Sequence, residues 1–138
     1  MEYALIFYTA HKTAYCETAL NSGLRTIQAK GEAIVAVTTP KDLGEAINLL
    51  LNKYDCIFVV GDLSRKDSNS VLRVLSAGLG AVNPQPICRR IRYKGYEDGY
   101  LINTIDRKQI VVLPDDPQAI EEIASVKMAP YLKATVDV

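Results

Sequence analysis

The sequence predicts an α/β protein, in the form of a three-layer α/β/α sandwich whose mostly parallel sheet has an antiparallel hairpin at one edge. Short apolar runs typical of buried strands alternate with stretches of helical periodicity up to about residue 80, and this alternation favours right-handed crossovers and a parallel sheet. After Asn83, prolines and shorter strand-like runs break the alternation, which predicts antiparallel pairing there. The length suits one core, so we expect residues 1–138 to form a single domain.

The first elements follow from apolar runs and helical spacing. Tyr3–Tyr8 and Glu32–Val37 are short apolar runs and predict the first two strands. Between them, apolar residues recur at helical spacing over Thr13–Lys30, and Gly31 is placed to end that helix.

The second helix has a clear start signal at Thr39. Thr39 can accept hydrogen bonds as a cap, Pro40 suits the first turn, and Asp42 favours the positive end of the helix dipole. The helix then has one apolar face, made of Leu43, Ala46, Ile47, Leu50 and Leu51.

The third strand, Cys56–Val60, is apolar throughout. Such a run predicts a central strand that is covered on both sides. We expect Ser68 or Asn69 to cap the helix that follows. The inner face of that helix is expected to contain Val71, Leu72, Leu75 and Leu79.

The C-terminal half predicts shorter elements. Strand-like runs cover Ile87–Tyr93, Tyr100–Ile105 and Gln109–Leu113, with a turn at residues 106–108. Pro117 can open a last helix that runs through Ile123. We expect the tail, from Pro130 through Lys133–Val138, to be a short strand or loose.

Charge and cysteine content exclude several classes of protein. The 16 basic and 16 acidic side chains cancel, whereas proteins dedicated to nucleic acids or membrane surfaces depend on a broad cationic field. No apolar stretch reaches the roughly 18 residues that span a bilayer, and the N-terminus lacks the basic region of a signal peptide. The three scattered cysteines are typical of free thiols. We therefore expect a cytoplasmic protein without membrane or nucleic-acid partners.

Two loops resemble the motifs of a known family. The stretch GDLSRKDSN, residues 61–69, follows the third strand, and VLPDDP, residues 112–117, ends a later one. Together with a glycine-containing hairpin at residues 95–102 and the order of elements, they resemble the molybdopterin-binding domain of molybdenum-cofactor biosynthesis proteins, most closely the version at the N-terminus of CinA-type competence/damage proteins. The resemblance covers most of the chain, in architecture more than in literal sequence. It implies a homo-oligomer, a dimer or a trimer.

The motifs depart from those of the family at their acidic positions. The family reads Gly-Gly-x-Gly-Pro-Thr followed by paired aspartates; here Ser68 and Asn69 stand for the aspartates, and Arg65 and Lys66 for Pro-Thr. In the second motif Asp115 replaces a glycine. A chain without these acidic positions is expected to lack the metal-assisted and nucleotidyl-transfer chemistry that the resemblance implies. We therefore predict no metal site, and no catalytic residue is assigned.

The candidate ligand-binding residues follow the predicted strands, at the sheet edge where doubly wound proteins bind anions. Arg65 and Lys66 favour a phosphate and Asp62 works against one, so a solvated loop with a helix cap explains this stretch equally well. A helix-start role is favoured over a cation site for Asp115 and Asp116, and a surface role over a general base for His11. The full candidate set is Thr9, His11, Gly61, Asp62, Ser64, Arg65, Lys66, Ser68, Asn69, Asp115 and Asp116.

These expectations lead to a function in the binding class. We infer a degenerate molybdopterin-binding-like domain that binds a pterin, a nucleotide or another phosphorylated small ligand without inherited catalysis. The ligands that the resemblance implies are molybdopterin and nucleotides, and no resident cofactor is assigned. One alternative is a CinA-type or molybdopterin-processing enzyme, a nucleotide pyrophosphatase or nucleotidyl transferase, with relocated catalytic residues; another is a structural or regulatory oligomer subunit. The basic segment Arg89–Lys94 fits an exposed edge strand better than a nucleic-acid site.

Overall fold

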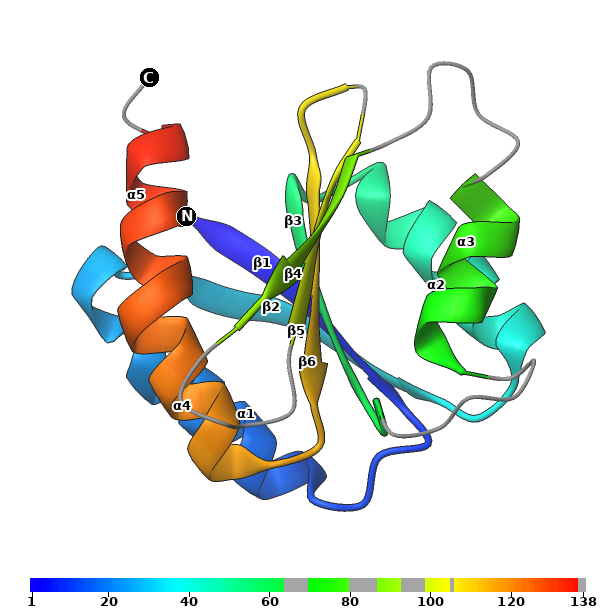
Figure 1. Ribbon diagram of the computed structural model, residues 1–138, viewed down its shortest axis with the longest axis horizontal. Helices are drawn as coiled ribbons and strands as arrows, with labels where there is room; N and C mark the ends of the chain where they lie inside the picture. The colour runs from blue at the N-terminus through cyan, green and yellow to red at the C-terminus, as the bar shows by residue number, and fades with distance from the viewer. Residues whose placement is uncertain (64–69, 80–86, 93–98, 105, 137–138) are drawn as a thin grey trace.

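A six-stranded sheet forms the middle layer of the computed structural model, which describes residues 1–63, 70–79, 87–92, 99–104 and 106–136. Within these residues the strand order is β2-β1-β3-β6-β5-β4 (Figure 1). The first four strands in this order run parallel, and β5 pairs antiparallel with both β6 and β4. The mixed sheet with an antiparallel edge is therefore confirmed. The strands are β1 (Glu2–Tyr8), β2 (Lys30–Val37), β3 (Cys56–Gly61), β4 (Ile87–Ile91), β5 (Gly99–Asn103) and β6 (Gln109–Pro114).

Helices cover both faces of the sheet, as the three-layer prediction requires. Figure 1 shows α1, α4 and α5 on one side of the strands and α2 and α3 on the other. The first layer contains α1 (Thr13–Gly23), the 3₁₀ turn η1 (Arg25–Ile27), α4 (Pro117–Ile123), the π-helical turn η2 (Ala124–Met128) and α5 (Ala129–Val136). The second layer contains α2 (Pro40–Leu51) and α3 (Val71–Leu79).

The strand β3 lies at the centre of the core. All of its residues are buried, and successive side chains point to opposite faces of a strand. Cys56, Phe58 and Val60 pack under α1 and α4, whereas Ile57 and Val59 pack under α2 and α3. The prediction of a central strand covered on both sides is confirmed.

The first helix is shorter than predicted. It ends at Gly23 and not near Lys30. At Gly23 the helix lies so close to η2 that a Cβ on Gly23 would come within 2.6 Å of the Cβ of Ala124. The left-handed residue that precedes β2 is Gln28, with φ of 56°, and the predicted cap Gly31 lies inside β2 against the ring of Tyr3. The helix therefore ends where it meets η2, and the apolar spacing beyond Gly23 belongs to η1 and the start of β2.

The tail is helical, so the prediction of a short strand or loose segment is wrong. The helix α4 continues through η2 into α5, and the sheet buries Met128, Ala129 and Leu132. Pro130 cannot donate a backbone hydrogen bond, and the wider π-helical turn ends at Met128, two residues before it. Burial of the apolar face thus carries the helix past a residue that normally breaks one.

Caps define where the helices of the second layer begin. Thr39 caps α2 as predicted, because its Oγ1 accepts a hydrogen bond from the N–H of Asp42 at 3.1 Å. The predicted cap of α3 is wrong: the helix begins at Val71, and the Oγ of Ser70 accepts from the N–H of Arg73 at 3.3 Å. Within the described residues, no helix is long and apolar enough to cross a membrane.

Candidate functional site

The candidate site lies where the parallel strands end. Because β2, β1, β3 and β6 are parallel, the loops that follow them meet at one edge of the sheet. The loops after β1 and β6 lead to α1 and α4 on one face, and those after β2 and β3 lead to α2 and α3 on the other. Neighbouring loops that leave in opposite directions open a crevice between them, and ligands of such sheets bind there.

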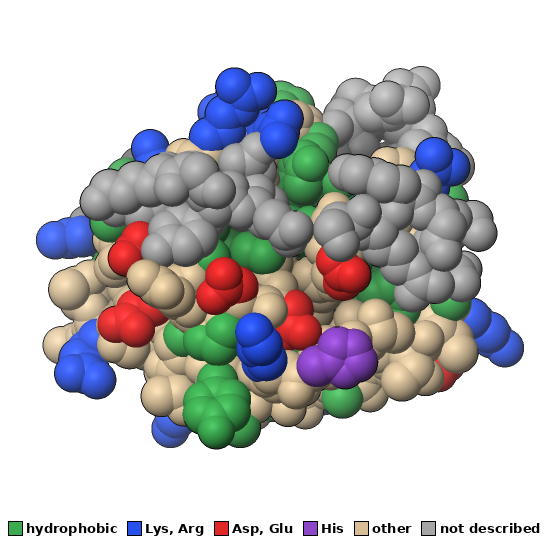
Figure 2. Space-filling model, turned by 60° about the horizontal axis from the view of Figure 1, so that its bottom comes forward, with side chains coloured by type: hydrophobic (Ala, Val, Ile, Leu, Met, Phe, Trp, Pro, Cys, Tyr) green, Lys and Arg blue, Asp and Glu red, His purple; other side chains and the backbone are tan. Residues whose placement is uncertain are grey.

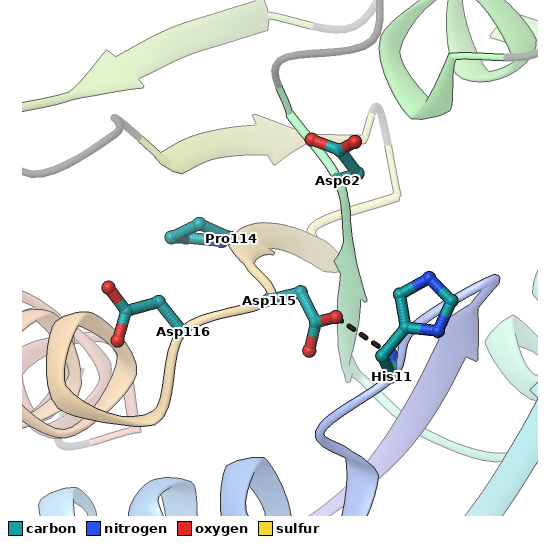
Figure 3. A pocket seen from close by; sticks show the side chains of 5 residues that line it. All are labelled: His11, Asp62, Pro114, Asp115 and Asp116. Atoms are coloured by element: carbon teal, nitrogen blue, oxygen red, sulfur yellow. Dashed lines mark hydrogen bonds between the residues drawn. The ribbon is translucent and has the colours of Figure 1, made fainter.

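Two adjoining cavities occupy this crevice. The larger, of about 390 Å³, is lined by Thr9, Ala10, His11, Thr38 and Asp62. The smaller, of about 240 Å³, is lined by His11, Asp62, Pro114, Asp115 and Asp116 (Figure 3). His11 and Asp62 line both cavities, so they lie where the two meet. Figure 2 shows the histidine at this surface, close to several acidic side chains.

Asp115 joins the loop after β6 to the loop after β1. One carboxylate oxygen accepts a hydrogen bond from the N–H of His11 at 2.8 Å, and the other from the N–H of Lys12 at 3.3 Å and from Cys16 Sγ at 3.5 Å. Lys12 is the N-cap residue of α1, so the negative charge lies near the positive end of that helix. Asp115 thus serves the start of α1. Its predicted effect on the dipole of α4, the helix that follows it, stays a prediction.

Asp116 caps the helix that follows it, as predicted. Its side chain accepts from the N–H groups of Gln118 at 3.0 Å and Ala119 at 3.4 Å, and Pro117 occupies the first turn. Two of the three carboxylates that line the smaller cavity are therefore engaged in holding the backbone.

Cys16 is a buried free cysteine in α1, and its thiol contacts Asp115 in the loop after β6. Burial raises its pKa to about 12, and the hydrogen bond to Asp115 adds to the shift. The thiol therefore stays protonated at neutral pH and donates to Asp115, so it is not activated as a nucleophile, a role that needs the thiolate.

Three polar side chains of the larger cavity are available to a ligand. Within the described residues, nothing forms a hydrogen bond with the hydroxyls of Thr9 and Thr38 or with the imidazole of His11. The carboxylate of Asp62 is exposed, although it does have an interaction partner. Hydroxyl and imidazole groups can both donate and accept, so this cavity suits a polar, uncharged part of a ligand.

The structure brings five of the predicted residues together: Thr9, His11, Asp62, Asp115 and Asp116. Thr38, which also lines the larger cavity, was not among the candidates. The signal for it was present, because Thr38 is a polar residue directly after a predicted parallel strand. Ser64, Arg65, Lys66, Ser68 and Asn69 lie outside the described residues.

Gly61 has a packing role at the end of β3. It is buried, and it is not among the described residues that line either cavity. A Cβ on Gly61 would lie 2.9 Å from Cγ2 of Val71 and 3.1 Å from the carbonyl oxygen of Tyr8. Its backbone is not left-handed, so close approach to α3, and not a sharp turn, accounts for the glycine.

The described residues contain no group of three or more His, Cys, Asp or Glu side chains arranged to hold a metal ion. The absence of a metal site remains a prediction. The basic segment is also only partly described: Arg89, Arg90 and Arg92 are exposed, and Lys94 lies outside the described residues.

Comparisons with known proteins identify the fold. No protein-family model matches the chain, and no curated protein matches it in sequence. Among solved structures, it is similar to the protein CinA from Thermoplasma acidophilum, with 15% identity, a TM-score of 0.64 and coverage of 99% of this chain and 96% of that one. It is similar to molybdenum cofactor biosynthesis protein B, with 15% identity, a TM-score of 0.69 and coverage of 99% and 94%.

A third similar structure is the tungsten cofactor synthesizing protein MoaB from Pyrococcus furiosus, with 11% identity, a TM-score of 0.56 and coverage of 97% and 96%. The matches extend over nearly the whole of each chain. At these identities they establish a common fold, so the resemblance expected from the sequence is confirmed at the level of architecture.

Proposed function

We propose that this chain, which has the fold of CinA and MoaB, is a binding domain that holds a pterin, a nucleotide or another phosphorylated small ligand in the crevice without converting it. The observation that carries the proposal is the pair of adjoining cavities that share His11 and Asp62 at the carboxyl ends of parallel strands. Sheets of this kind bind ligands at that edge. The names of two similar structures refer to cofactor biosynthesis, which supports ligands of the pterin class.

The roles of the carboxylates support binding over catalysis. A general base needs a basic group that can reach the reacting proton. Asp115 and Asp116 already accept backbone hydrogen bonds. Among the described residues, no carboxylate accepts a hydrogen bond from the imidazole of His11 and so orients that ring. The CinA-type enzyme remains the alternative that a turnover measurement separates from this proposal.

The charge that binds a phosphate is assigned to Arg65 and Lys66. The described lining of the two cavities contains three aspartates and no arginine or lysine. Arg65 and Lys66 follow shortly after Asp62 in the sequence. Binding through these side chains weakens as salt rises, because salt screens exposed charges.

The test is calorimetric titration of guanosine 5′-monophosphate (GMP), ADP-ribose and neopterin at low and high salt. The parent should bind at least one of the three, and for GMP or ADP-ribose the Arg65→Ala/Lys66→Ala variant should bind about tenfold more weakly. The matched control, Arg25→Ala/Lys53→Ala, removes the same charge from exposed positions before β2 and β3, away from the crevice. It should bind as the parent does.

The same samples are assayed for turnover of the three compounds with and without magnesium. No turnover is expected. Metal-dependent hydrolysis would favour the CinA-type enzyme over the binding domain. If none of the three compounds binds, the proposal fails and the structural or regulatory oligomer subunit takes its place.

The proposal extends to the organisation of the chain. Residues 1–138 would form one domain, acting in the cytoplasm as a homo-oligomer, either a dimer or a trimer. The free thiols of Cys16, Cys56 and Cys88 are consistent with a reducing compartment. Light scattering on the purified chain measures the assembly directly, and a strictly monomeric mass would contradict the oligomer.

A further inference from the structure

Thr9, at the end of β1, has an unusual backbone conformation. Its φ is 49°, in the left-handed region. In the described part of the chain, two further non-glycine residues have a positive φ, Gln28 and Arg107. Neither of them is branched at Cβ. A branched Cβ makes this conformation costly, since it crowds the neighbouring carbonyl group. Thr9 is therefore the most strained of the three by residue type.

The backbone alone does not explain a threonine at this position. The N–H of Thr9 donates to the carbonyl of Val37 at 3.0 Å, which continues the pairing of β1 and β2 by one residue. Glycine would form the same hydrogen bond in the same conformation at lower cost. Strain that persists in a binding region points to a function of the side chain.

The position of Thr9 beside the larger cavity indicates that its side chain contacts a ligand. Thr9 lines the larger cavity together with Thr38, which follows the neighbouring strand β2. Within the described residues, neither hydroxyl has a hydrogen-bond partner. Two threonines from adjacent strand ends therefore line one cavity, and neither hydroxyl is engaged by another described residue.

We propose that Thr9 contacts the ligand and determines specificity: its hydroxyl, together with that of Thr38, binds a pair of neighbouring hydroxyl groups on the ligand. Each threonine hydroxyl can donate one hydrogen bond and accept others, which matches the chemistry of a diol. A ribose and the trihydroxypropyl side chain of neopterin both carry such a pair. This inference rests on the proposed function, because it names the part of the ligand that enters the larger cavity.

The experiment compares probes with and without the hydroxyls. Neopterin is paired with pterin, which lacks the side chain, and GMP is paired with its 2′,3′-dideoxy form. The parent should bind one hydroxyl-bearing probe more tightly than its partner, and the pair that shows this preference distinguishes a pterin from a nucleotide. Thr9→Val, which keeps the shape and removes the hydroxyl, should weaken that binding about 3- to 10-fold and leave the hydroxyl-free probe unchanged. Thr9→Ser should bind as the parent does.

A stability measurement separates this role from a structural one. Thr9→Gly relieves the strained conformation, so its Tm should equal or exceed that of the parent. Gln28→Gly and Arg107→Gly are the matched controls, since both residues have positive φ and neither is among the described residues that line the cavities. All three variants should keep their stability, and Thr9→Gly should be the variant that loses affinity.

Two results would overturn the inference and they are distinguishable. If the parent binds a probe and Thr9→Val binds every probe equally well, Thr9 has no role in recognition and the proposed function stands. If the parent binds neither these four probes nor ADP-ribose, the proposed function fails and this inference fails with it.

Discussion

At the scale of single residues, two neighbouring aspartates, Asp115 and Asp116, bind different segments of the backbone. Asp115 binds the backbone of His11 and Lys12, far away in the sequence, whereas Asp116 binds the first turn of its own helix. The role of Asp116 could be read from the sequence, because a cap and its helix are local. The role of Asp115 could not, because its partners are brought to it by the pairing of β1, β3 and β6.

Replacing Asp115 tests whether it positions His11. Asp115→Ala leaves the exposed N–H groups of His11 and Lys12 to water and should cost about 1 kcal/mol of stability. Amide hydrogen exchange measured by NMR should speed up at His11 and Lys12. In the matched variant Asp116→Ala, the cost should be about 1 kcal/mol, and exchange should speed up at Gln118 and Ala119. If the amide of His11 exchanges no faster in Asp115→Ala than in the parent, other contacts hold the loop after β1.

At the scale of elements, the sequence located the strands well and misjudged where two helices end. Apolar runs marked β1, β3 and β6 within a residue or two, and Thr39 marked the start of α2 correctly. Both ends depend on tertiary contact, because Gly23 at the end of α1 approaches Ala124 of η2 and the tail packs into the core through Leu132. Local spacing carries no information about these contacts.

Two helical glycines offer a matched pair of substitutions. In Gly23→Ala the new methyl group would lie 2.6 Å from Ala124 Cβ and 2.8 Å from the carbonyl oxygen of Glu121, so the variant should lose about 1–3 kcal/mol of stability. At Gly44, inside α2, a Cβ would have nothing within 4 Å of it. Gly44→Ala should therefore gain about 0.5–1 kcal/mol.

Urea unfolding of both variants measures these effects. A Gly23→Ala variant as stable as the parent would mean that α1 and η2 can move apart at little cost in free energy. The fold would then not depend on their close contact.

At the scale of the whole molecule, the layers, the mixed sheet and the edge of the sheet where the candidate cavities lie were all predictable. They follow from the order of strands and helices, which connection rules convert into a topology. The occupants of the crevice were less predictable. Thr38 was missed and Gly61 was assigned to the site, because the lining of a cavity depends on which side chains the surrounding packing leaves uncovered.

Stability should fall as the pH rises above about 9. Burial raises the pKa of Cys16, Cys56 and Tyr3 to about 12, from 9.0 for the thiols and 10.0 for the phenol. In the unfolded chain these groups lose their protons at the lower values, while the folded chain keeps them. The folded state then binds more protons, so the free energy of unfolding decreases with pH in this range.

The measurement is the urea midpoint from neutral pH to about pH 11. Tyr3→Phe removes one of the three titrations and should make the decline shallower. A midpoint that stays constant across this range would show that these groups titrate equally in the folded and unfolded chains.

The position of β3 has a consequence for how the chain reaches its fold. One neighbour, β1, comes from the preceding part of the chain, whereas the other, β6, is made after α3, β4 and β5. We expect β1 and β3 to pair before β6 docks, during synthesis because β6 is made later and during refolding because distant pairings close slowly. During that interval an entirely apolar strand has an open edge, which is a template for pairing between molecules. The yield of soluble protein should then depend on how fast β6 docks and not on the stability of the finished fold.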